Sequence, residues 1–274
     1  MRRNIPAEEP IAVIKIGGSI LRGARAYRRA AVFVRNRNRV APGEKLVVVV
    51  SAQEGATDRL ERTARKIVHD ADVTALDLLW CTGELRSVAL LVLQLQALGV
   101  SAAGLSIHEA GLRVQSDAGS AALDAKRVRV NPEWIHKALE EHSVAVVPGF
   151  FATNARNRIV SLGRGGSDLT AVLLAAGLQA RRCELLKDVP GYFTSDPHRD
   201  PAARQIPSLT FEEALALADG GCDLVQREAI EAAGRFQLPL VIRALDESAP
   251  LSRITDVEMN TGWADPIASG AVAS

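Results

Sequence analysis

Cysteine, net charge and long apolar runs are all scarce in this sequence. The three cysteines, Cys81, Cys183 and Cys222, lie far apart among the 274 residues and form no short paired spacing. Their pattern argues against a disulfide framework or a zinc site and indicates a reduced, cytoplasmic protein. The 33 basic and 32 acidic residues leave a net charge of +1, which provides no field that would attract nucleic acid or anionic lipid. We therefore expect neither nucleic acid nor a membrane among the partners.

The most apolar helical stretch, Val88–Leu98, is too short and too interrupted to cross a bilayer. It contains Gln94 and Gln96, and a membrane span needs ~20 predominantly apolar residues. Its helical spacing favours packing in the core over a role as a dimer face. The overall composition, 47% hydrophobic and 24% charged, is that of an ordinary globular protein.

Short β-branched runs alternate with longer helical patterns along the chain. Ile11–Ile14 and Leu46–Val50 are continuous apolar runs, as is typical of strands buried on both faces. Helical patterns and further strands follow, with helices expected over 24–40, 57–70, 76–98, 132–141, 169–176, 211–218 and 226–236, strands near 100–106, 144–147, 183–186 and 238–242, and a hairpin over 150–162. The alternation predicts an α/β fold around a mainly parallel sheet.

A first glycine-rich segment, Lys15-Ile16-Gly17-Gly18-Ser19, follows the first predicted strand. Adjacent glycines let the backbone approach a ligand closely, their N–H groups can point at anionic oxygens, and the lysine adds a mobile positive charge. The segment therefore indicates phosphate binding. Taken alone, it fits equally well with a plain strand-to-helix turn that carries a surface lysine.

Two more segments have the residue types of a ligand site. In Ser161–Asp168, glycines precede a helical pattern, Ser167 or Asp168 is suited to cap that helix, and Arg164 offers a planar fork to a carboxylate or phosphate. The segment indicates a second anion site, against the alternative of a flexible capped loop. Ser51 and Thr57 follow the second strand and could offer hydroxyls to a small polar substrate, although both are also common capping residues.

Several segments of the chain form an ordered set of motifs: Lys15–Ser19, Val49–Ala52, Gly83–Glu84, Pro148–Phe150, Leu162–Asp168 and Asp188–Gly191 with Asp196–Pro197. They occur in the order found in aspartate kinases, and residues 10–245 resemble the catalytic domain of the amino acid kinase family. The resemblance implies a three-layer αβα sandwich with a mainly parallel central sheet. We expect an amino-acid lobe over 1–150, a nucleotide lobe over 151–258 and a flexible tail over 259–274, with no length left for the C-terminal ACT regulatory domains of many aspartate kinases.

By the same resemblance, the chain is expected to be a kinase of amino-acid biosynthesis. It would use ATP, with Mg²⁺ carried by the nucleotide, to phosphorylate the side-chain carboxylate of aspartate or a close analogue to an acyl phosphate, and it would form a homodimer. Lys15 would contact the transferred phosphoryl group, and Asp168 would position the phosphate-binding lysines. The remaining implied site residues are Gly17, Gly18 and Ser19 on the phosphate path, Ser51, Thr57, Glu84, Arg164 and Ser167 around the amino acid, and Asp188, Phe193, His198 and Asp223 around the nucleotide. No residue is expected to ligate a metal.

The departures from the family pattern fall on the nucleotide side. Lys187 stands where aspartate kinases usually have threonine, Phe193 where they have tyrosine, and His198 where they have arginine. Asp223 replaces a lysine near the ATP phosphates, which inverts a charge. Two hypotheses follow. Lys187 could supply the lost positive charge as part of the catalytic site, or the chain could be a catalytically inactive homologue that binds a small molecule in a regulatory role.

Overall fold

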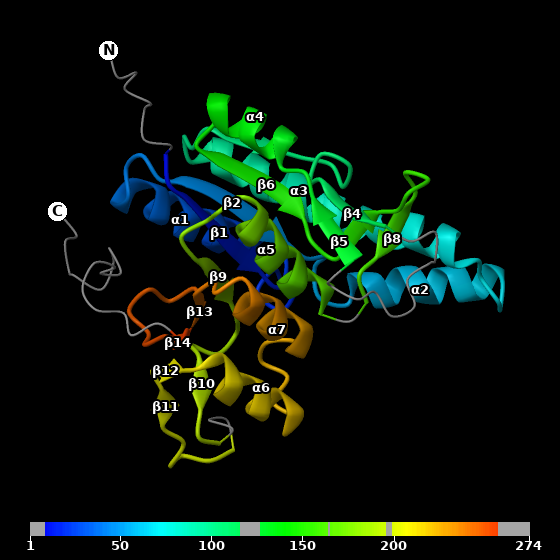
Figure 1. The fold of residues 1–274 in the computed structure, drawn as a ribbon. Helices are drawn as coiled ribbons and strands as arrows, with labels where there is room; N and C mark the ends of the chain where they lie inside the picture. The colour runs from blue at the N-terminus through cyan, green and yellow to red at the C-terminus, as the bar shows by residue number, and fades with distance from the viewer. Residues whose placement is uncertain (1–8, 116–126, 164, 196–198, 257–274) are drawn as a thin grey trace.

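The computed structural model describes residues 9–115, 127–163, 165–195 and 199–256, and a central eight-stranded sheet organises them (Figure 1). Its strand order is β12-β14-β13-β9-β1-β2-β6-β3. Every neighbouring pair is parallel except β13 and β14. The strands are β1 (Ile11–Ile16), β2 (Lys45–Val50), β3 (Ala102–Gly104), β6 (Val144–Pro148), β9 (Cys183–Leu186), β12 (Ser208–Leu209), β13 (Leu240–Arg243) and β14 (Ser252–Ile254).

Helices cover both faces of this sheet, so the predicted three-layer α/β sandwich is confirmed (Figure 1). One face packs against α1 (Ala24–Val40) and α3 (Val73–Ala97), and the other against α4 (Glu133–Glu141), α5 (Gly166–Gly177), α6 (Phe211–Asp219) and α7 (Arg227–Arg235). The remaining helix of the described ranges, α2 (Ala56–Ile67), lies against α3. None of the described helices is long and apolar enough to span a membrane.

The alternation of side chains along the inner strands explains why both faces need cover. In β1, Val13 points into the core beneath α5, whereas Ile14 and Ile16 point into the core beneath α1. All of these side chains are fully buried. Strands that are apolar on both faces are stable only between two helical layers, because each face must be removed from water.

A smaller four-stranded sheet, in the order β5-β4-β7-β8, adjoins the main one. Its strands are β5 (Val128–Val130), β4 (Leu112–Val114), β7 (Phe151–Thr153) and β8 (Ile159–Ser161). The predicted hairpin is confirmed as β7 and β8, whose turn is held by Asn154 because its Oδ1 accepts bonds from the Arg156 and Arg158 amides, each at 3.0 Å. A two-stranded unit, β10 (Tyr192–Phe193) with β11 (Gln205–Ile206), completes the strands.

In the central sheet, strands from before and after residue 150 meet at the parallel pair β1 and β9, and in the smaller sheet they meet where β4 pairs with β7. On one side of the β1 and β9 pair lie β2, β6 and β3, and on the other lie β13, β14 and β12. The two predicted lobes, 1–150 and 151–258, would therefore share a continuous sheet, and the lobe boundary stays a prediction. The predicted tail, 259–274, lies outside the described residues.

Candidate active site

Three charged side chains meet at the carboxyl edge of the central pair of strands. Lys15 is near the end of β1, Lys187 directly follows β9, and Asp168 is in the first turn of α5. The Lys15 Nζ lies 2.7 Å from Asp168 Oδ1, and the Lys187 Nζ lies 2.7 Å from Oδ2. The carboxylate is 2% exposed, so it is held almost wholly by these two ammonium groups. We call these three residues the lysine–aspartate trio.

The backbone around Gly165 places Asp168 in the trio. The sequence pattern suggested Ser167 or Asp168 as the N-cap of α5, and the structure corrects this, because the cap is Gly165 with φ of 73° and no side-chain cap bond. A Cβ at Gly165 would lie 1.8 Å from the Gln226 Cγ, so only glycine fits this left-handed position. Asp168 instead falls inside the first helical turn, where the helix dipole favours a negative charge.

The trio carries a net positive charge in a buried setting. Burial opposes ionisation of Asp168, but the charges of Lys15 and Lys187 outweigh it and hold the pKa of this carboxyl at about 2. Burial and the charge of Lys15 together lower the pKa of Lys187, while Asp168 counteracts them. Two ammonium groups facing one carboxylate leave one positive charge, and the exposed Asp188 adds only a weaker attraction to Lys187. The arrangement therefore suits an anionic ligand.

The glycine turn after β1 lies directly beside the trio. A methyl group at Gly17 would sit 3.3 Å from the Lys15 Nζ and 3.8 Å from the Ser19 Oγ, so this backbone borders the ammonium group. Gly18 approaches the next loop so closely that a Cβ there would lie 2.4 Å from the Ala52 carbonyl oxygen. Glycine at both positions thus gives a ligand access to the lysine and lets the two loops meet.

The buried Glu84 of α3 lies against the loop that follows β2. Its Oε1 accepts a hydrogen bond from the Ala52 amide at 3.2 Å, and a Cβ at Gly83 would lie 2.9 Å from the Ala52 Cβ. The Glu84 Oε2 is buried and has no hydrogen-bond partner among the described residues. Burial raises the pKa of this carboxyl to about 7. A buried oxygen without a partner is costly, so this position is suited to a cationic group of a ligand.

Ser167 packs against the end of β6 and is fixed there by the chain around Phe150. A Cβ at Gly149 would lie 2.8 Å from the Ser167 Oγ. Phe150 has a φ of 71°, unusual for a bulky residue, and its amide donates to the Thr170 Oγ1 at 3.1 Å. Such strain persists only where surrounding contacts support it, and it often marks a functional site.

The other predicted residues lie around this centre without joining the trio. Ser51 directly follows β2, and its amide donates to the Ile16 carbonyl at 3.2 Å, while Thr57 is in the first turn of α2. Phe193 is paired in β10 with Gln205, and Asp223 is exposed in the loop before α7, with no ion pair to any described residue. Arg164 and His198 lie outside the described residues.

One feature of the region was missed in the sequence. Tyr192, next to Phe193, is 1% exposed, and its hydroxyl has no partner among the described residues. Burial is the main reason that the pKa of this phenol is raised, and Asp168 lies close enough to contribute. The phenylalanine at 193, where the family usually has tyrosine, was a signal that the aromatic residues of this segment depart from the family pattern.

The fold and the site together define an α/β protein with a positively charged trio at the edge of its central strands β1 and β9. Residues 10–244 match the model of the amino acid kinase family, and the chain belongs to this family. The aspartokinase of Thermus thermophilus is 39% identical over 217 residues, which are 79% of this chain and 53% of that protein. The chain therefore spans about half the length of this curated relative.

Solved structures agree with this membership. The aspartate kinase from Synechocystis is 32% identical, with a TM-score of 0.75 over 92% of this chain and 40% of its own. The aspartokinase III of E. coli, solved with aspartate and ADP, is 25% identical with a TM-score of 0.75, and the match covers 91% of this chain and 65% of its own. The resemblance predicted from the sequence motifs is confirmed.

Proposed function

We propose that this chain transfers the γ-phosphoryl group of ATP to the side-chain carboxylate of aspartate or a close analogue, as an enzyme of amino-acid biosynthesis. The observation that carries this proposal is the lysine–aspartate trio at the carboxyl edge of β1 and β9. The similarity to a structure solved with aspartate and ADP supports both substrates. The three free cysteines are consistent with a reducing, cytoplasmic setting.

In this reaction the trio would supply charge and position. Phosphoryl transfer relies on in-line placement and on stabilising negative charge on the transferred group. Lys15 and Lys187 would donate hydrogen bonds to the phosphoryl oxygens, Asp168 would keep both ammonium groups in place, and the turn Gly17–Ser19 would let the phosphates approach. The attacking carboxylate is ionised at neutral pH, so no general base is needed.

The acceptor would lie between Glu84 and Ser167. The Glu84 Oε2, which has no partner within the described ranges, would accept a hydrogen bond from the substrate ammonium. Ser51, Thr57 and Ser167 would bind polar groups of the acceptor through their hydroxyls. Arg164 would pair with its α-carboxylate, as the family resemblance implies, and the nucleotide would lie toward Asp188, Phe193, His198 and Asp223.

Magnesium would be bound by the phosphates of ATP. Within the described ranges, no group of three acidic, histidine or cysteine side chains is arranged to hold a metal. The oxygens of Asp168 both face lysines, which removes the most buried carboxylate of the site from metal binding. Mg²⁺ commonly binds through substrate phosphates and water with few protein ligands, so the residues present fit this role. Its contribution would be to neutralise charge on the phosphates.

The alternative is an inactive homologue that binds an amino acid without turnover. One observation supports turnover, since Lys187 reaches Asp168 beside Lys15 whereas Asp223 is exposed and has no ion pair to any described residue. The cation that the family places at position 223 would thus be replaced by Lys187, which directly follows β9.

A homodimer is part of the proposal. Leu78 and Leu93 of α3 are 55% and 60% exposed, and their spacing puts them on one side of the helix. Exposed leucines on a long helix are suited to a symmetric contact between two copies. A change of Leu93→Asp should then reduce the mass measured by light scattering from that of a dimer to that of a monomer.

The decisive test is trapping of the acyl phosphate with hydroxylamine. The protein is incubated with Mg-ATP and aspartate, or with related carboxylic amino acids, and the hydroxamate is measured. We expect a signal that Lys15→Ala abolishes and that Lys66→Ala, a change of an exposed lysine on α2, leaves intact. No hydroxamate with any acid, together with thermal stabilisation by an amino acid but not by ATP, would overturn the kinase in favour of the binding protein.

A further inference from the structure

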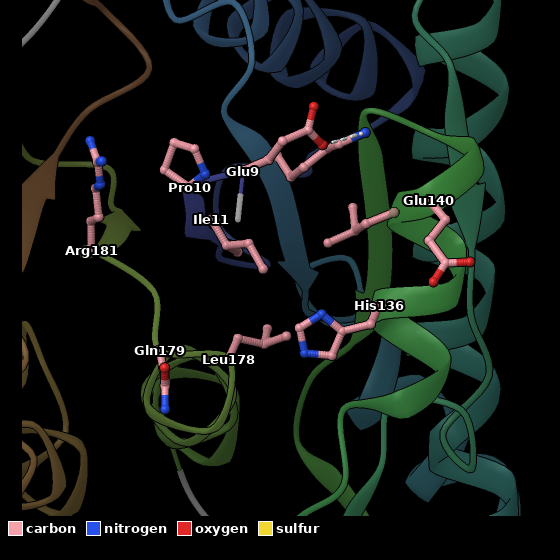
Figure 2. Close-up of a pocket in the computed structure, with 10 residues that line it drawn as sticks. Glu9, Pro10, Ile11, His136, Glu140, Leu178, Gln179 and Arg181 are labelled. Carbon is pink, nitrogen blue, oxygen red and sulfur yellow. Dashed lines mark ion pairs between the residues drawn. The ribbon is translucent and has the colours of Figure 1, made fainter. Parts of the chain in front are cut away.

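A pocket of about 380 Å³ lies at the opposite edge of the central sheet from the lysine–aspartate trio (Figure 2). Its lining comes from Ile11 at the start of β1, Lys45 at the start of β2, α4, and the segment Leu178–Arg181 that follows α5. The volume is within the range of small-molecule sites and far above the ~30 Å³ that one water occupies in the liquid.

The pocket has an apolar middle. Ile11, Leu139 and Leu178 come from β1, α4 and the end of α5 respectively, and all three side chains line it. Leu139 and Leu178 are only 4% and 5% exposed, so their positions are set by the core. Ile11 is partly exposed beside them, and a preformed aliphatic patch of this kind suits a ligand with a short hydrocarbon segment.

Opposite charges flank this aliphatic surface. Figure 2 shows Arg181 on one side of Ile11 and Leu178, and Glu140 on the other. Neither has an ion pair with any described residue, so both charges are available to a ligand. Lys45 is in a different situation, because its Nζ lies 3.2 Å from Glu9 Oε2 and also donates to the His142 carbonyl at 3.3 Å.

We infer that this pocket binds a small aliphatic zwitterion, with a carboxylate at one end and an ammonium group at the other. The carboxylate would pair with the planar fork of Arg181, the ammonium with Glu140, and the connecting methylene groups would lie over Leu139 and Leu178. ω-Amino acids have this pattern, as do diamino acids through their distal ammonium. The two charges of the pocket thus select against a fatty acid, which lacks the cation, and against an alkylamine, which lacks the anion.

Two elements, β1 and α5, run from the pocket to the proposed active site. β1 carries Ile11 at one end and Lys15 near the other, and α5 begins close to Asp168 and ends before Leu178. The two sites lie at opposite edges of the sheet and share no lining residue, so both could be occupied together. The zwitterion site does not depend on the proposed kinase activity.

The first experiment measures binding of 6-aminohexanoate to the full chain by calorimetry. We expect saturable binding of one molecule per chain. Hexanoate and hexylamine, which each lack one charged end, should bind at least tenfold more weakly. A series from 4-aminobutyrate to 8-aminooctanoate should show an optimum length. Absence of binding by the whole series, or equal binding of hexanoate, would overturn the proposal, the latter in favour of a simple anion site.

Variants then place the ligand in this pocket. Arg181→Glu and Glu140→Arg should each weaken binding at least tenfold, and the combined exchange should restore it, because the ligand can bind in the reverse orientation. Glu141→Arg, a neighbouring exposed change on α4, is the matched control. His136→Trp fills the pocket from its exposed rim and should block binding even if a charge variant folds poorly.

One further variant separates this inference from the proposed function. Binding should persist in Glu84→Gln, which alters the proposed acceptor site. Loss of binding in Glu84→Gln with retention in Arg181→Glu would put the ligand in the acceptor site and refute binding in this pocket. The hydroxamate signal of Arg181→Glu, measured without zwitterion, should match that of the unchanged protein, so failure of either proposal can be recognised independently of the other.

Discussion

Two buried clusters of charge occupy opposite faces of the central strand β9, and their residue types differ. On the α5 face is the lysine–aspartate trio. On the α1 face, Glu184 is fully buried and accepts from Arg37 Nη2 at 2.5 Å and from Arg182 Nε at 2.8 Å, while Arg243 Nη1 lies 3.6 Å away. Arg182 also forms a bidentate pair with Glu44, at 2.6 and 2.9 Å. We call these five residues the arginine cluster.

The difference follows from what each cluster must do. The arginine cluster is closed between the sheet and α1, and its guanidinium groups are always charged, planar and able to make several fixed bonds at once. Arg243 also stacks over Phe33, with its guanidinium carbon 5.4 Å from the ring centre. The trio borders a glycine turn at the sheet edge, where a compact ammonium on a flexible stem can turn from Asp168 toward a phosphate. The arginines are therefore suited to a structural role, whereas the lysines are suited to the chemical role that the proposed function gives them.

The change expected to have the largest effect is Glu184→Gln. It removes the carboxylate that faces three buried guanidinium groups, and breaking a buried ion pair in this way costs about 3–5 kcal/mol. Urea denaturation should show this loss in the free energy of unfolding, with Glu228→Gln, a change of an exposed residue on α7, as control. A loss below about 1 kcal/mol would mean that the arginine cluster is not structural.

Asp168→Asn should mainly reduce activity, whereas Glu184→Gln should mainly reduce stability. Without the carboxylate, the two lysines lose their shared anchor and Lys187, whose pKa is already lowered, is more easily deprotonated. Loss of a positioned electrostatic group typically costs about 10²–10³-fold in kcat. Steady-state hydroxamate formation measures this. A stability loss as large as that of Glu184→Gln, with kcat preserved, would show that the two clusters have the same role.

Exchanging the two cation types provides a sharper comparison. Arg182→Lys cannot keep both bonds to Glu44, so it should cost about 1.5–3 kcal/mol of folding free energy with little effect on kcat. Lys15→Arg should lower kcat while changing stability less, because the larger fork does not fit beside Gly17. Thermal unfolding and activity measured on both variants give the comparison, and equal effects on the two properties in both variants would contradict it.

The smallest expected effect is a pH dependence of acceptor binding through Glu84. Burial raises the pKa of its carboxyl from the ordinary 4.5 to about 7, so the unliganded protein gains a proton there as pH falls below 7. If the substrate ammonium binds only the ionised form, KM for the acceptor should be constant above pH 7 and rise up to tenfold per unit below it. Steady-state kinetics between pH 6 and 8 check this, with Glu84→Gln expected to have a high, flat KM. A KM that falls as pH decreases would refute the assignment.

Local sequence signals predicted the elements of the fold well, for a clear physical reason. The expected helix 24–40 and strand 183–186 coincide with α1 and β9. The helix is long and has an apolar face, and three of the four residues in the strand are apolar, so local pattern and burial agree. The three-residue strands β4 and β5 were not predicted, because so short a segment has too few residues to show an alternation and is stabilised by its neighbours in the sheet.

The motifs similarly predicted which residues belong to the site, but not how they contact one another. Lys15, Asp168 and Lys187 are separated by more than a hundred and fifty residues at the widest, and only the pairing of β1 with β9 brings their side chains together. The Ser167 or Asp168 cap was wrong because the close approach of Gln226 requires the left-handed glycine at 165. That contact comes from a loop distant in sequence.

By itself, the sequence determined the α/β class, the positions of the glycine turns and the presence of a lysine where the family has threonine, since these depend on local composition and order. Only the tertiary structure decided that Lys187 shares Asp168 with Lys15, that Glu84 keeps one oxygen without a partner, and that Arg181 and Glu140 flank one apolar surface. Such facts depend on distances between residues far apart in the chain, and those distances are set by the packing of helices on a common sheet.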